Sequence, residues 1–140
     1  MPAPADLWMP DVRHARTLVI EAALCDDDGD RYLQAHRAVA HAADAAVLAR
    51  TGRRLPTDPV DPWLLVARTV PGLAEWATYF AALQRRRQAV DAGRLVVSTR
   101  EADDLVRDAD LFCEAVIAST RLTARPVGNG AVGNRGRAVG

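Results

Sequence analysis

The sequence predicts an all-α protein, specifically an up-and-down antiparallel four-helix bundle with a short extra helix before the third long helix. Three observations support this prediction. Apolar residues recur every three or four positions in four separate segments, stretches containing Pro and Gly divide those segments, and strand-like character is limited to the brief Leu95-Val96-Val97. The 140 residues are enough for one domain with its own core.

We expect three regions along the chain: a disordered N-terminus over residues 1–10, a helical domain over 11–122 and a disordered Gly/Arg-containing tail over 123–140. The first ten residues are rich in Pro and Ala. The tail consists of Gly, Asn, Arg, Val and Pro without helical periodicity, so it buries too little apolar surface to offset the entropy of ordering.

The first helix is expected to start after Asp11 and to run to about Cys25, and the aspartate cluster at 26–30 should end it and cap the second helix. Because the connection is short, the two helices should be antiparallel neighbours. The second helix, about Asp30 to Arg50, is dominated by alanine. Small residues let a neighbouring backbone approach closely, so we expect this helix at the centre of the bundle.

A loop is predicted over residues 51–60, followed by a short helical turn over 63–66 that begins at Asp61-Pro62. A third long helix should run from Leu73 to near Gly93. The fourth should begin with a capping box, in which Ser98 and Glu101 satisfy each other's free backbone N–H groups. We interpret Trp63, Trp76, Tyr79 and Phe80 as core residues.

The composition excludes a global electrostatic field. All 18 basic residues are arginine and they equal the acidic residues in number, so any site for a polyanion must be local. Arginine in place of lysine, with abundant Ala, Val and Asp, is typical of a GC-rich bacterial genome. We expect a cytoplasmic protein without a membrane partner, because no signal peptide and no apolar stretch of about 20 residues is present. Cys25 and Cys113 are then reduced, core-facing thiols.

The candidate catalytic residues are Arg31 and His36, which begin the second helix in a chain with three histidines. A guanidinium in the first helical turn can grip two phosphate oxygens, and an imidazole can give and take a proton. Five residues separate the two side chains by about 140° around the helix, so they converge only on a shared groove or a dimer seam. The alternatives are a buried histidine at position 36 and an ion pair from Arg31 to Asp27, Asp28 or Asp30.

Three further residues are candidates for substrate binding. Tyr32 could stack on a base beside the motif, and Arg37 either contacts substrate or belongs to a solvated face. His41, with Asp44 one turn later, could form a proton relay or half of a metal site. A full metal site needs three or four ligands, and the sequence offers no source for the rest, so we expect no metal and no cofactor.

The run Arg85-Arg86-Arg87, with Arg94 after it, is the densest basic patch. It could contact a phosphate backbone. Alternatively it solvates a helix end and complements the helix dipole, with its charge cancelled by acidic residues of the fourth helix. Those acidic residues are Asp103, Asp104, Asp108 and Asp110.

Three stretches resemble the actinobacterial branch of the HEPN (higher eukaryotes and prokaryotes nucleotide-binding) domains. They are Arg31-Tyr32 with Ala35-His36, then residues 73–77 with Tyr79-Phe80, and then residues 100–105 with 107–109. The resemblance spans roughly residues 10–118. It implies a helical bundle, a homodimer and, for Arg31 and His36, the Arg-x4–6-His pair that many HEPN domains use as a metal-independent ribonuclease centre.

The resemblance therefore implies a HEPN-type domain that binds RNA, with His36 moving a proton and Arg31 stabilising charge on the phosphate if the pair is catalytic. The alternative is a non-catalytic helical module that binds a nucleotide or a protein partner. Other HEPN branches have lost the active pair and act in this way.

Overall fold

The computed structural model describes residues 3–56 and 61–124. Their fold is entirely helical, which confirms the all-α prediction. The helices are α1 (Ala5–Ala23), α2 (Asp28–Thr51), α3 (Pro62–Thr69), α4 (Ala74–Ala82), α5 (Gln84–Asp91) and α6 (Thr99–Ala124), with a 3₁₀ turn, η1 (Pro71–Leu73), before α4. None of these helices is long and apolar enough to cross a membrane.

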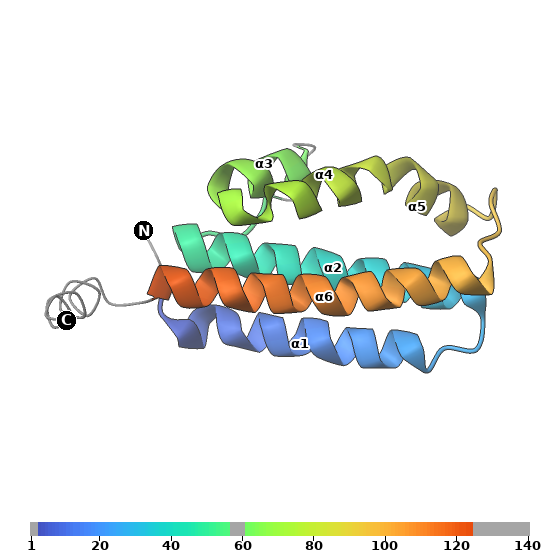
Figure 1. Cartoon of the computed structure of the whole chain (residues 1–140), viewed down its shortest axis with the longest axis horizontal. Coiled ribbons are helices and arrows are strands. Elements are labelled where there is room, and N and C mark those ends of the chain that lie inside the picture. The colour runs from blue at the N-terminus through green and yellow to red at the C-terminus, as the bar shows by residue number, and fades with distance from the viewer. Residues whose placement is uncertain (1–2, 57–60, 125–140) are drawn as a thin grey trace, which may run out of the picture.

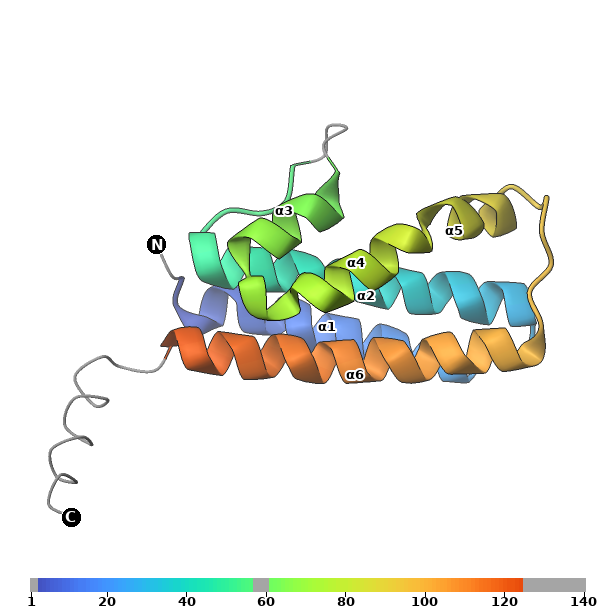
Figure 2. The ribbon, with the colours of Figure 1, turned by 45° about the horizontal axis from the view of Figure 1, so that its top comes forward.

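The three long helices α1, α2 and α6 lie side by side, and the shorter helices cover the side of α2 and α6 that is away from α1 (Figures 1 and 2). α1 and α2 run in opposite directions as neighbours, as predicted. α2 is the central helix. Alanine side chains are small, so both neighbouring long helices can approach the α2 backbone closely. Six buried alanines of α2 are Ala35, Ala38, Ala42, Ala43, Ala45 and Ala46.

The N-terminal prediction is wrong for residues 5–10, which belong to α1. Trp8 is buried, its indole N–H donates to the Ala3 carbonyl at 3.3 Å, and the Ala3 N–H donates to the Ala49 carbonyl at 2.9 Å. This packing against the end of α2 outweighs the loss of one helical hydrogen bond at Pro10. At the other end, Thr123 and Ala124 extend α6, and the rest of the predicted tail lies outside the described residues, as do residues 57–60 of the predicted loop.

The predicted third long helix is divided into α4 and α5 at Leu83. The Leu83 N–H donates to the Phe80 carbonyl at 3.1 Å, a bond from residue i to i−3 that tightens the last turn of α4. The division redirects α5 so that it lies against α2 (Figure 2). No Pro or Gly marks the position, so the continuous stripe of apolar residues concealed it.

α6 has only half of the predicted capping box. The Glu101 N–H donates to the Ser98 hydroxyl at 3.0 Å, as expected. The Glu101 carboxylate instead accepts hydrogen bonds from the guanidinium of Arg86, which ties α5 to the start of α6 and lowers the pKa of Glu101.

An aromatic cluster fills the space between the two layers. Trp63, Phe80 and Phe112 are buried, and their ring centroids lie 5.1 to 6.1 Å apart. This confirms the core interpretation of Trp63 and Phe80. Trp76 is only half-buried, and Tyr79 is 41% exposed, so the core interpretation is wrong for Tyr79.

Candidate functional site

α2 carries all five residues that the sequence nominates for a site. Its first turn is fixed by Asp27, whose side chain accepts a hydrogen bond from the Asp30 N–H at 2.9 Å, and Gly52 ends it in the left-handed conformation with φ 77°. The intervening alanines favour a long regular helix. The five side chains therefore point in directions set by helical spacing.

Arg31 is engaged within the chain. Its guanidinium lies 2.8 Å from the Asp28 carboxylate and 3.5 Å from that of Asp103. It also donates to the carbonyls of Cys25 at 2.9 Å and Asp26 at 3.3 Å. With the side chain 12% exposed, Arg31 closes the turn between α1 and α2.

Asp28 extends this connection to α6. The same carboxylate that pairs with Arg31 accepts a hydrogen bond from the Thr99 hydroxyl at 2.8 Å. These two hydrogen bonds lower the pKa of Asp28. The ion pair that the sequence offered as an alternative role for Arg31 is thus present, with Asp28 as the partner.

His36 is buried, with only 7% of its surface exposed. Its ring packs edge-on against Tyr32, with centroids 4.7 Å apart, and its Nε2 atom is buried without a hydrogen-bond partner among the described residues. Burial, with a smaller contribution from the charge of Arg87, lowers the pKa of His36 to about 4. The imidazole is therefore neutral at pH 7.

A pocket of about 470 Å³ lies beside His36, between α2, α3 and α5. We call it the His36 pocket, and it is lined by Leu33, His36, Arg37, Ala40, Trp63, Gln84, Arg87 and Asp91. Two guanidinium groups face a single carboxylate here. The Arg37 guanidinium donates to Gln34 at 3.1 Å and that of Arg87 to Gln84 at 3.2 Å. Neither arginine forms an ion pair with a described residue.

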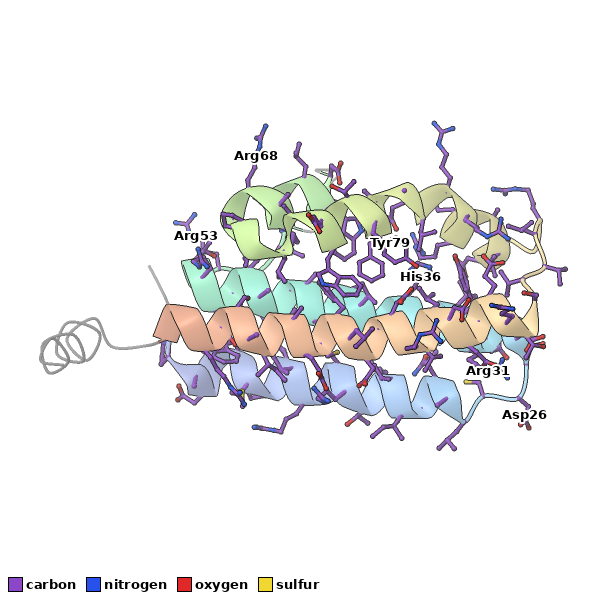
Figure 3. The ribbon with its side chains drawn as sticks, viewed as in Figure 1. Asp26, Arg31, His36, Arg53, Arg68 and Tyr79 are labelled. Carbon is purple, nitrogen blue, oxygen red and sulfur yellow. The ribbon has the colours of Figure 1, made fainter. Side chains whose placement is uncertain are left out.

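The lining of the His36 pocket does not include Arg31. Figure 3 shows Arg31 close to Asp26, at the end of the bundle where α1 connects to α2, while His36 lies farther along α2. The two side chains leave the helix in directions roughly 140° apart, and neither is long enough to meet the other within the single chain.

Tyr32 lies beneath a separate, smaller cavity of about 300 Å³ that is bounded by α2, α4 and α6. The side chain is only 1% exposed, and in the part of the chain that the structure describes its buried hydroxyl has no hydrogen-bond partner. Burial raises the pKa of Tyr32, so the phenol stays protonated. With neither ring face open to solvent, Tyr32 packs against His36 and presents no surface on which a base could stack.

His41 lies at the interface of α1 and α2, where its ring meets that of His14 with centroids 4.7 Å apart. Burial and the neighbouring His14 lower the pKa of His41. The Asp44 carboxylate accepts from Arg54 at 2.7 Å and from the Leu55 N–H at 2.8 Å. Within the described ranges, no group of three or more His, Cys, Asp or Glu residues is placed to hold a metal ion.

Sequence reasoning missed the contribution of α5 to the pocket. The run of three arginines has divided roles, because Arg86 pairs with Glu101 while Arg87 faces the His36 pocket. Gln84, Arg87 and Asp91 recur at intervals of three and four residues, which places them on one face of a helix. That spacing could have indicated, from the sequence alone, that the three residues line one site.

The fold and the pocket together define a helical-bundle domain with a small basic cleft built around a buried histidine. The chain belongs to the HEPN family: the model described as SAV_6107-like HEPN matches residues 22–117, from the end of α1 to the last turns of α6. Neither the curated proteins nor the solved structures gave a match.

Proposed function

We propose that this HEPN domain binds single-stranded RNA, with the ribose–phosphate backbone entering the His36 pocket. The observation that carries the proposal is the His36 pocket itself, which the guanidinium-bearing Arg37 and Arg87 line together with a neutral His36. Two guanidinium groups beside one carboxylate favour an anionic ligand, and a guanidinium can donate two parallel hydrogen bonds to phosphate oxygens.

The pocket residues suit different parts of a nucleotide. Arg37 and Arg87 have free N–H groups for phosphate oxygens. A neutral His36 can donate to or accept from a ribose hydroxyl or a base edge. Asp91 can accept from a ribose 2′-hydroxyl, the group that distinguishes RNA from DNA.

We favour binding without cleavage. A pKa of about 4 makes His36 a weak base at pH 7 and leaves almost none of it protonated to act as an acid. Arg31, its proposed catalytic partner, already contacts Asp28 and two backbone carbonyls. Both observations support a role for Arg31 in holding the turn and for His36 in contacting ligand.

The test is a fluorescence anisotropy titration of a labelled ten-residue oligouridine in EDTA. Arg87→Gln should weaken binding about tenfold, as expected for the loss of one charge-assisted contact. Arg85→Gln is the matched control, because Arg85 is exposed in the same run and lies outside the pocket lining. Its affinity should stay within about twofold of wild type. Equal losses in the two variants, or no binding by wild type, would overturn the proposal.

The same samples, run on a denaturing gel, separate binding from cleavage. We expect intact RNA with the wild-type protein. Cleavage that is lost in both Arg31→Ala and His36→Ala would instead establish the metal-independent ribonuclease. Failure of the wild type to bind RNA would favour the nucleotide- or protein-binding module.

A further inference from the structure

A second, larger hollow lies on another part of the surface, where η1 and α4 meet α6. This groove has a volume of about 780 Å³, and we call it the Trp76 groove. Its polar and aromatic lining consists of Glu75, Trp76, Tyr79 and Asp108. It shares no lining residue with the His36 pocket.

The Trp76 groove carries two carboxylates that have no cationic partner in the described part of the chain. Asp108 accepts a hydrogen bond from the Tyr79 hydroxyl at 2.5 Å, and Glu75 is exposed on α4. Acidic neighbours on α6 differ in this respect, because Asp104 pairs with Arg107 at 2.9 Å and Asp110 with Arg16 at 3.6 Å. Within residues 3–56 and 61–124, no arginine lines the groove, so its two carboxylates face no compensating cation there.

Two aromatic rings complete the groove. The rings of Trp76 and Tyr79 have centroids 6.3 Å apart and an interplanar angle of 72°, so they form two walls at a steep angle. Trp76 is held from behind, stacked on Phe80 with centroids 5.7 Å apart and packed against Phe112 at 5.6 Å. Its position is therefore fixed before any ligand arrives.

Hydrogen bonding and open space also suit a cation. The hydrogen bond from Tyr79 orients the Asp108 carboxylate while leaving it further acceptor capacity. Burial and the hydrogen bond to Asp108 raise the pKa of Tyr79, which keeps the phenol neutral and its O–H a donor. Among the described residues, no atom lies within 4 Å of a Cβ added at Gly72, so the space beside this lining residue is open.

We propose that the Trp76 groove binds the guanidinium group of an arginine side chain. Aromatic faces attract cations through their quadrupole, and carboxylates supply paired acceptors. A guanidinium is flat, weakly hydrated and able to stack while donating to both carboxylates, which an ammonium group matches less well. This site is independent of the proposed RNA site.

The probe is N-acetyl-arginine methylamide, titrated into ¹⁵N-labelled protein while the amide signals of residues 72–79 and the Trp76 indole are followed. Its neutral isostere, N-acetyl-citrulline methylamide, tests whether charge is needed. We expect saturable shifts with the arginine compound and at least about tenfold weaker binding of the citrulline compound. Equal binding of the two would overturn the proposal.

Surface variants locate the binding. Asp108→Asn should weaken binding of the arginine compound about tenfold, and Glu75→Gln should weaken it to a smaller extent. Asp6→Asn is the charge-matched control, since Asp6 is exposed on α1, and it should change affinity by less than about twofold. Circular dichroism confirms that each variant is folded. Unchanged affinity in Asp108→Asn would overturn the assignment.

Two substitutions at Tyr79 distinguish the contribution of its aromatic ring to binding from that of its hydroxyl. Tyr79→Phe keeps the aromatic wall and releases an Asp108 oxygen, so binding should persist, whereas Tyr79→Leu should weaken it.

A short peptide containing one arginine identifies the source of the ligand. Tighter binding of the peptide than of the amino-acid derivative indicates a protein partner, and equal binding indicates a free guanidinium compound. Either result supports the site. If neither the peptide nor the amino-acid derivative binds, the proposal is overturned.

Discussion

His36 determines how the stability of the folded protein should depend on pH. Its pKa is about 4 in the folded chain and about 6.5 when unfolded, so the unfolded state binds more protons between these values. The contribution of neutral His36 to the free energy of unfolding is fully present above pH 6.5 and is lost as the pH drops toward 4. Lowering the pH from 7 to 4.5 should reduce the free energy of unfolding by about 2 to 3 kcal/mol through His36 alone.

Urea unfolding of wild type and His36→Gln at both pH values measures this effect. The free-energy difference between the two proteins should favour wild type more at pH 7 than at pH 4.5. Parallel pH profiles for the two proteins would contradict a buried neutral His36.

Arg31 should matter for stability more than for RNA. Arg31→Ala removes the donors to the Cys25 and Asp26 carbonyls and leaves Asp28 without its ion-pair partner. We expect thermal unfolding to shift down by a few degrees, with a smaller shift for Arg31→Lys. RNA affinity of the folded variant should match wild type. A stable Arg31→Ala protein with lost RNA binding would return Arg31 to the ligand site.

α2 depends on small side chains where its neighbours approach. Ala42 has no exposed surface, so Ala42→Leu should destabilise the bundle by about 1 to 3 kcal/mol through overpacking. Ala40→Leu is the comparison, because Ala40 is exposed on the same helix and its change should be within about 0.5 kcal/mol. Chemical denaturation of both variants provides the measurement. Equal effects would mean that α2 is not closely packed.

Helical periodicity predicted the existence of the helices well and their junctions less well. The stripe through Phe80 and Leu83 indicated a helix but could not reveal the division at Leu83, which depends on packing against α2. The Pro- and Ala-rich composition of the first ten residues suggested disorder, although burial of Trp8 keeps residues 5–10 helical. Cross-helix partners were beyond local patterns. His14 meets His41, and Arg86 meets Glu101, because of how the helices align in three dimensions.

The candidate site shows the same division between local and long-range information. The sequence indicated His36 and Arg37, since both lie on one helix with an obvious motif. It missed the partnership with Arg87 and Trp63, which α5 and α3 bring to the His36 pocket. Arg31 was grouped with His36 by sequence spacing, while the fold uses its guanidinium at the turn between α1 and α2.

For the whole molecule, a net charge of zero limits how RNA binding responds to salt. Without a global field, the dependence should come from the Arg37 and Arg87 contacts alone. A plot of log affinity against log salt concentration should have a slope of about −1.4, which is two contacts at about −0.7 each for a single strand. Anisotropy titrations over a range of salt concentrations measure it. A slope much steeper than this would indicate binding across a broad surface instead of the pocket.

RNA binding as proposed uses the residues of the His36 pocket that one chain supplies. The homodimer implied by the HEPN resemblance remains a separate prediction. Analytical ultracentrifugation with and without RNA checks it. We expect one RNA site per chain whatever the oligomeric state, and a site formed only in the dimer would contradict the pocket.

The most direct test of the central claim uses the chain's three histidines as probes. With ring-labelled histidine, NMR signals of His36 should shift and saturate as oligouridine is added, because His36 contacts the ligand. Signals of His14 and His41, paired at the interface of α1 and α2, should stay unchanged. RNA that binds without moving the His36 signals, or that moves only those of His14 and His41, would contradict the account.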